Sequence, residues 1–111
     1  MIEKILLRYL SDALYVPAYM EEPEKPPKRY LVLEKTGGGM DNHIYSATFI
    51  IQSYGASLLE AAELNEQVKV AMLYGDAPNA ICRVELNSDY NFTDPETKRY
   101  RYQAVFDIKH Y

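Results

Sequence analysis

The sequence contains few of the residues that covalent cross-links and membrane spans require. Its 111 residues include a single cysteine, Cys82, which excludes a disulfide within the chain and suits a reducing compartment. Cys82 lies in an alternating apolar run, so we expect it to be a buried small apolar residue and not a reactive thiol. No apolar run approaches the roughly 18 residues of a membrane span, and the first residues lack the long apolar stretch and cleavage site of a signal peptide. We therefore expect a protein that folds in the cytoplasm and does not enter a membrane.

An excess of positive charge is also absent. The chain has 12 Lys and Arg against 16 Asp and Glu, a net charge of −4. Binding to nucleic acid by broad neutralisation of phosphates needs a cationic face, so this charge argues against that function. It remains compatible with a conduit that lets DNA pass without holding it, because an acidic wall repels the duplex.

The residues that carry catalysis or bind metals are equally sparse. The two histidines, His43 and His110, lie at a strand start and near the C-terminus, and no His, Cys and Asp cluster has zinc spacing. The triple glycine 37–39 is not followed by Lys-Ser/Thr or by a helix, so it is not a phosphate loop. In Tyr100-Arg-Tyr102 the strand alternation places tyrosines and arginines on opposite faces, which argues against a stacking platform for single-stranded nucleic acid. We expect no enzyme, no cofactor and no metal site.

Tyrosine, in contrast, is abundant. The chain has 11 tyrosines and no tryptophan. Tyrosine favours strands, and it is also enriched at protein interfaces, where its ring packs and its hydroxyl stays hydrated. Packing on a sheet and a role in an interface both remain open for each of them.

Hydrophobic periodicity divides the chain into helices and strands. Apolar residues spaced three and four apart predict a first helix, and Ser57-Leu-Leu-Glu60 is a capping box that opens a second helix ending at Gly75. Alternating patterns predict four strands, the third with Cys82, Val84 and Leu86 facing inward. The expected elements are helices over residues 2–14 and 57–74 and strands over residues 30–36, 43–54, 81–90 and 99–108.

Two connections have a distinct composition. Residues 17–28 contain four prolines, which exclude a helix and a central strand, so we expect a stiff extended crossing in which 18–20 could pair briefly at a sheet edge. A ligand for a proline-recognition domain is the alternative. Residues 37–42, Gly-Gly-Gly-Met-Asp-Asn, predict the turn between the first two strands, because glycine adopts positive φ without strain.

These elements predict one α+β domain over residues 1–111. Its mostly antiparallel four-stranded sheet would carry both helices packed on one face, in the order α-β-β-α-β-β.

Several segments together carry a family resemblance. They are Tyr15-Val-Pro17 after a short helix, Arg29-Tyr-Leu-Val-Leu-Glu-Lys-Thr-Gly-Gly38 after the prolines, Ala47-Thr-Phe-Ile-Ile-Gln-Ser-Tyr-Gly55 before Ser57-Leu-Leu-Glu-Ala-Ala62, and the closing strands Arg83-Val-Glu-Leu86 and 100–108. In this combination the chain resembles the tail terminator, or tail-completion, proteins of long-tailed bacteriophages and prophages.

The resemblance implies a structural protein of the virion. Members of that family form a typically hexameric ring on the head-proximal end of the tail tube. The ring stops tube polymerisation and joins the tail to the head, and DNA later passes through its lumen without specific binding. The implied partners are further copies of the chain, the tail tube protein and the head–tail connector protein. The implied location is the host cytoplasm before assembly and the tail and neck of the virion afterwards.

The crossing and the glycine turn are the segments that we expect to contact partners, because both would project from the sheet without being needed for the core. A head–tail connector or head-closure protein, or a small non-catalytic adaptor domain, remains an alternative function. The candidate interface residues are Tyr19, Met20, Glu22, Lys25, Lys28, Gly38, Met40, Asp41 and Asn42.

Overall fold

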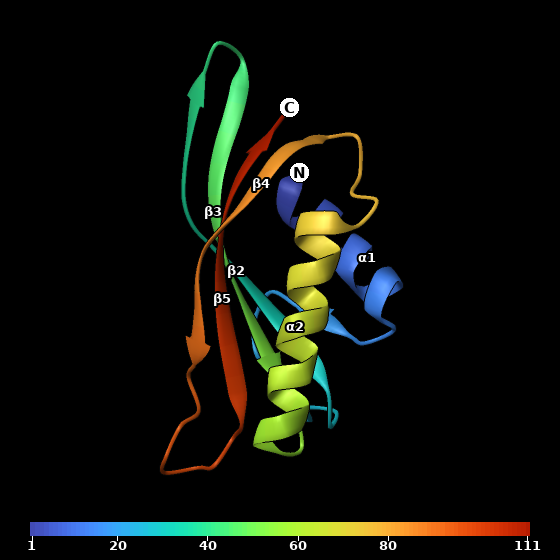
Figure 1. Ribbon diagram of the computed structural model, residues 1–111, viewed down its shortest axis with the longest axis vertical. Helices are drawn as coiled ribbons and strands as arrows, with labels where there is room; N and C mark the ends of the chain where they lie inside the picture. The colour runs from blue at the N-terminus through green and yellow to red at the C-terminus, as the bar shows by residue number, and fades with distance from the viewer.

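The computed structural model describes all residues 1–111 as two helices laid across one face of a single sheet (Figure 1). The α+β class and the two helices are confirmed. The four expected strands are present and pair in antiparallel fashion, but the expected number of strands is wrong, because the sheet has five strands in the order β1-β2-β3-β5-β4, and the added β1 pairs with β2 in parallel. The elements are α1 (Ile2–Leu14), β1 (Ala18–Tyr19), β2 (Tyr30–Asp41), β3 (Ile44–Tyr54), α2 (Leu58–Tyr74), β4 (Ile81–Asn91) and β5 (Arg101–His110).

The extra strand follows from how α1 ends. Tyr15 adopts a left-handed conformation with φ 55°, and its N–H donates to the Ser11 carbonyl at 3.0 Å. This cap turns the chain before Pro17. The Pro17 carbonyl then accepts from the N–H of Leu31 at 2.9 Å, and Ala18 follows alongside β2. The brief edge pairing expected for 18–20 is thus present at Ala18–Tyr19.

The start of α2 is the clearest case of local sequence deciding local structure. The Ser57 side chain accepts from the N–H of Glu60 at 3.2 Å, and the Glu60 carboxylate accepts from the N–H of Ala56 at 2.9 Å. The Ser57 side chain satisfies an amide that the first helical turn leaves free, and the Glu60 carboxylate ties the residue before the N-cap to the helix. The capping box predicted from the sequence is confirmed.

The turn between β2 and β3 lies later than the glycines predict. β2 continues through Gly37, Gly38 and Gly39 to Asp41, which faces Ile44 across a two-residue turn. Asn42 and His43 make that turn with φ 50° and 65°, and no glycine has a positive φ. Two positive values are the geometry of a tight hairpin turn whose twist matches the strands. The glycine turn expected over residues 37–42 is therefore wrong.

β4 also departs from the expected alternation. Its register against β5 shifts between Ile81 and Arg83 and again between Leu86 and Ser88. Each shift inserts one extra residue, and Cys82 is the first of them. Cys82 is consequently exposed, and the expectation of a buried cysteine is wrong.

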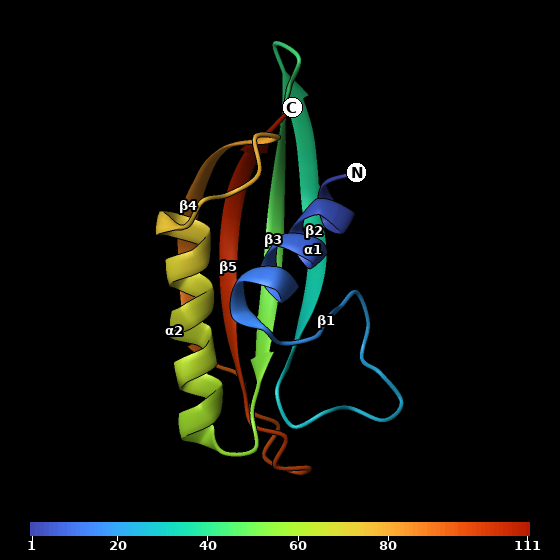
Figure 2. The same cartoon turned by 90° about the vertical axis from the view of Figure 1, so that its right-hand side faces the viewer.

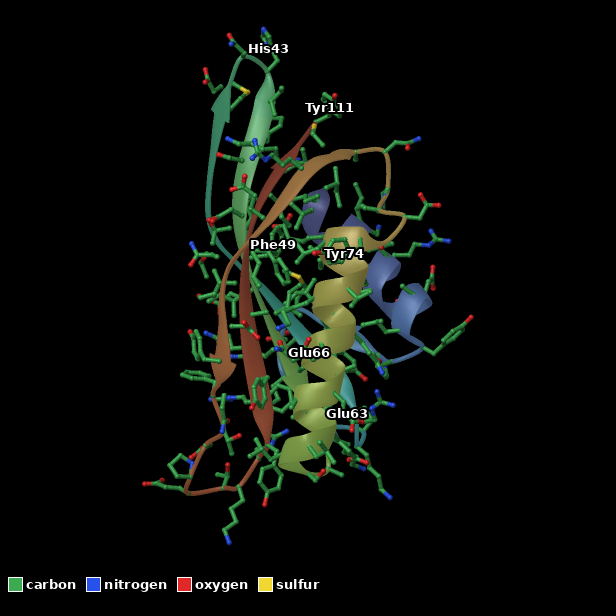
Figure 3. All side chains as sticks on the ribbon, in the orientation of Figure 1. His43, Phe49, Glu63, Glu66, Tyr74 and Tyr111 are labelled. Atoms are coloured by element: carbon green, nitrogen blue, oxygen red, sulfur yellow. The ribbon has the colours of Figure 1, made fainter.

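The core lies between the helices and the sheet. It is formed by apolar side chains from one stripe of each helix and from the inner positions of β2, β3 and β5, and Phe49 lies at its centre (Figure 3). The opposite face of the sheet carries no helix, as the edge-on view in Figure 1 shows. Polar pairs cross that face, including Thr48 donating to Asp107 at 2.9 Å and Gln52 donating to Gln103 at 3.0 Å.

The two ends of the chain lie close together. Met1, Ile2 and Tyr111 line one shallow depression, together with Tyr45 of β3. Figure 1 shows both termini toward the end of the molecule from which the β2–β3 hairpin projects.

Candidate assembly surface

The β2–β3 hairpin extends beyond the rest of the protein at one end (Figures 1 and 2). We call residues 37–46 the hairpin arm. Every residue of the arm from 37 to 45 is exposed, and His43 marks its tip (Figure 3). The β3 side of the arm is supported by β5 as far as the pair Tyr45 and His110, whose rings stack with centroids 5.4 Å apart. The arm is therefore a regular two-stranded extension with one supported side.

The arm carries apolar side chains in water. Met40 is 60% exposed, Tyr45 is 47% exposed, and Ile44 is also exposed. Of the predicted interface residues, Gly38, Met40, Asp41 and Asn42 lie here, where none has an ionic partner within the chain. Exposed apolar side chains grouped on a projecting element are typical of a surface that another protein covers.

The proline-rich crossing is anchored to the sheet at two of its predicted interface residues. The Tyr19 ring meets Tyr30 edge-on at 6.0 Å, and Tyr30 stacks on Tyr54 at 4.4 Å. The Glu22 carboxylate accepts from the Tyr30 hydroxyl at 3.0 Å and forms an ion pair with Arg99. Tyr19 and Glu22 thus stabilise the fold whatever else they contact.

Burial and the contact with Glu22 both act on the Tyr30 hydroxyl, and the positive charge of Arg99 opposes them only in part. Tyr30 is only 2% exposed. Burial, and then the hydrogen bond to Glu22, raise the pKa of the Tyr30 hydroxyl above its usual range. Arg99 also lies over the Tyr54 ring, with its guanidinium carbon 5.5 Å from the centroid. Among the predicted interface residues of the crossing, Met20, Lys25 and Lys28 are exposed and form no ion pair within the chain.

The structure separates the predicted interface residues into two groups. β1 pairs with β2 at Leu31 and Val32, whereas the arm ends at Asp41. Six strand residues lead from Val32 to Gly38 and nine lead to Asp41, so at roughly 3.3 Å each the two groups lie about 20 to 30 Å apart. The crossing and the arm therefore cannot form one site on one copy of the chain.

Two surfaces were not anticipated from the sequence. The first is a groove between α1 and α2, lined mainly by Tyr9, Leu14, Val70 and Ala71. The Tyr9 hydroxyl crosses it and donates to the Ala71 carbonyl at 2.7 Å, and burial raises the pKa of that hydroxyl. The sequence could have indicated this groove, because α2 carries exposed apolar residues outside its buried stripe, among them Val70. Tyr74 is another, and Figure 3 shows it at the end of α2.

The second surface is the outer edge of β4. It is the last strand of the sheet, so no other strand pairs with its outer side. On the helix side, β4 is held by Asp89, whose carboxylate accepts from Asn65 at 3.0 Å and from Lys69 at 2.9 Å. Hydrogen bonds with Glu66 and then Asp89 raise the pKa of Lys69. This edge is firmly attached to the body and free on its outer side.

No group of three or more His, Cys, Asp and Glu side chains is arranged to hold a metal ion. The acidic residues Glu63 and Glu66 on α2 lie on its outer side, as Figure 3 shows. Neither helix combines the length and the apolar composition needed to cross a bilayer.

Comparison with known proteins gives no family for this fold and surface. No protein-family model matches the chain, and no curated protein is significantly similar to it.

Proposed function

We propose that this protein is a structural subunit of a ring at the head-proximal end of a bacteriophage tail tube. In this role it ends tube polymerisation and provides the surface that joins the tail to the head. The activity is geometric, and no bond is made or broken. The proposal comes from the sequence resemblance.

The observation that best supports it is the hairpin arm. The arm extends past the body, exposes Met40, Ile44 and Tyr45, and contributes no residue to the buried core, which begins at Ala47 next to its base. A projecting strand pair of this kind suits a subunit that reaches a neighbour or a tube. The acidic net charge of −4 suits a ring whose lumen must let DNA slide through.

The test is reconstitution with the tail tube protein encoded by the same phage or prophage. Purified protein is mixed with polymerising tube protein, and tube lengths and ends are measured by negative-stain electron microscopy. We expect shorter tubes with a distinct density at one end, and a ring in sedimentation experiments.

Two results would count against this role. Unchanged tube lengths with no bound protein would exclude a terminator. Binding to the connector protein, with no affinity for the tube, would favour a position nearer the head.

A further inference from the structure

The chain itself explains the three consecutive glycines of β2 only in part. The register of β2 against β3 shifts between Lys35 and Gly37, and glycine is common beside such an irregularity. None of the three has a positive φ, so any amino acid could adopt their backbone conformation. A Cβ at Gly38 would lie 3.2 Å from the flexible end of Lys35 and 3.3 Å from the Ser46 carbonyl, and one at Gly39 would lie 3.3 Å from the Ser46 hydroxyl, whereas a Cβ at Gly37 would meet nothing within 4 Å.

Glycine is costly in such a position. It loses more conformational entropy on folding than other residues, and a glycine inside a strand often marks close approach of another backbone. Since nothing in the folded chain occupies the space beside Gly37, a partner that approaches this part of β2 from outside is the remaining reason for glycine there.

The outer edge of β2 is open beside the glycines. β1 covers only Leu31 and Val32, so no strand pairs with that side of β2 from Leu33 to Asp41. The edge of β4 is open along Ile81–Asn91. Natural proteins usually cover or interrupt free edges, because unpaired N–H and C=O groups recruit another strand.

The two open edges have the polarity to pair with each other. β2 is antiparallel to β3, β3 to β5 and β5 to β4, so β4 runs antiparallel to β2. A β4 edge of one copy placed beside the β2 edge of the next copy continues the sheet in the same alternating sense.

The side chains at matching heights are complementary in size. Across the sheet Gly39 pairs with Ser46, Ser46 with Lys109 and Lys109 with Arg83, so Gly39 and Arg83 lie at the same position along the strand direction. Gly37 and Glu85 correspond in the same way, by the pairs with Thr48 and Asp107. Arg83 and Glu85 are long and exposed. Bare glycines on the facing edge leave room for them where larger side chains would crowd them.

We propose that the glycine edge of β2 binds the β4 edge of a second copy of this chain as an antiparallel strand pair. The strand pairing is argued from the sheet edges alone, whereas its closure into a ring rests on the proposed function. Two different surfaces meet, so the contact is head-to-tail, and such contacts close into a ring when the rotation permits. A contact between two β2 edges would instead stop at a dimer and leave both β4 edges open.

The native cysteine makes a direct test possible. Cys82 is exposed and lies on the β4 edge at the height of Gly39 and Met40. Cysteine is introduced singly at Lys35, Gly37 or Gly39 (K35C, G37C, G39C), and assembled protein is treated with a short bis-maleimide. Three positions along β2 are tested so that an offset of neighbouring subunits along the strand direction does not prevent the cross-link.

We expect at least one of the three variants to give a ladder of covalent oligomers on denaturing gels. The control is the same variant with Cys82→Ser, which should lose the ladder. Dimers that persist in the Cys82→Ser background would show two β2 edges in contact and overturn the proposal. A complete absence of cross-links in all three variants would overturn it as well.

A second measurement separates assembly from folding. The double variant carries Gly37→Thr and Gly39→Val. Its β-branched side chains stiffen the strand, so its melting temperature should equal or exceed that of the wild type. Assembly should weaken by roughly tenfold or more, a difference of about 1.4 kcal/mol. Lys109→Thr, on the inner strand β5 at the height of Gly39, is the matched control and should assemble normally.

The outcomes distinguish this inference from the proposed function. Rings that form but never cross-link through Cys82 would refute the edge pairing and leave the ring role intact. Cross-linked rings that ignore the tail tube would refute the tail role and leave the edge pairing intact.

Discussion

Shortening the hairpin arm should remove assembly and leave a folded protein. The variant deletes two facing pairs, Met40 with Tyr45 and Asp41 with Ile44, and keeps Asn42 and His43 as the turn. Deleting an even number of pairs preserves the alternation of faces and the hydrogen-bonding phase of the pair that flanks the turn.

The expected loss of stability is small. The deleted ladder hydrogen bonds contribute about 1 kcal/mol each, but the deleted residues also no longer incur an ordering cost of about 1 to 2 kcal/mol each. The net loss of stability therefore comes mainly from the lost stacking of Tyr45 on His110, with centroids 5.4 Å apart. Such a contact contributes about 0.5 to 1.5 kcal/mol. For a domain of this size we expect a melting temperature lower by about 4 °C.

The assays are thermal unfolding by circular dichroism and sedimentation velocity with and without tube protein. Ser57→Ala is the matched control, because it should cost a similar amount of stability far from the arm and still assemble. A shortened variant that unfolds, or whose cooperative transition disappears, would refute the view that the arm is independent of the core. Normal assembly of the shortened variant would refute the role of the arm.

Three further outcomes follow from single sites. Ser57→Ala removes the side-chain acceptor for the Glu60 amide and should cost about 1 kcal/mol in urea unfolding; an unchanged midpoint would contradict the capping role. Lys69 has a raised pKa in the folded protein, so its contribution is complete below the ordinary lysine pKa of about 10.4 and is lost as pH rises through the folded value. The stability difference between the wild type and Lys69→Met should therefore be present at neutral pH and shrink in strongly alkaline solution, and a pH-independent difference would argue against the ion pair with Asp89. Cys82 is exposed, so in the folded protein it should react with a thiol reagent about as fast as in protein unfolded in urea. Reaction only after unfolding would place Cys82 in the core.

The parts of the fold that were predictable depend on local interactions. The bounds of α1 and α2 follow from apolar spacing, the Ser57 capping box and Gly75, and all of these are neighbours in the sequence. The apolar spacing also indicates which residues of α2 are buried, because Leu64 and Val68 are fully buried, although Leu58 in its first turn is 39% exposed.

The errors come from features that alternation cannot reveal. Glycine has no side chain to show which face it occupies, so a strand through Gly37–Gly39 looks like a turn. A β-bulge adds one residue and reverses the inside–outside assignment after it, which is why Cys82 was assigned to the wrong side. The pairing of Ala18–Tyr19 with β2 is long-range and leaves no local mark.

The candidate surface was only partly accessible to sequence reasoning. Met40, Asp41 and Asn42 were identified as projecting residues because short polar and flexible segments favour surfaces. The anchoring of Glu22 by Arg99 and Tyr30 was missed, since Arg99 lies 69 residues after Tyr30 in the sequence. Sequence reasoning also missed that Arg101, the first residue of β5, lies over the rings of Phe92 at 4.7 Å and Tyr54 at 5.8 Å.

The neighbouring positions of Met1 and Tyr111 have a practical consequence for anyone who handles this protein. An affinity tag fused to either terminus would sit beside the hairpin arm and could block the contacts under study. The Asp94–Lys98 turn lies at the far end of β5. A circularly permuted chain that opens there and links Tyr111 to Met1 would carry its tag away from the arm.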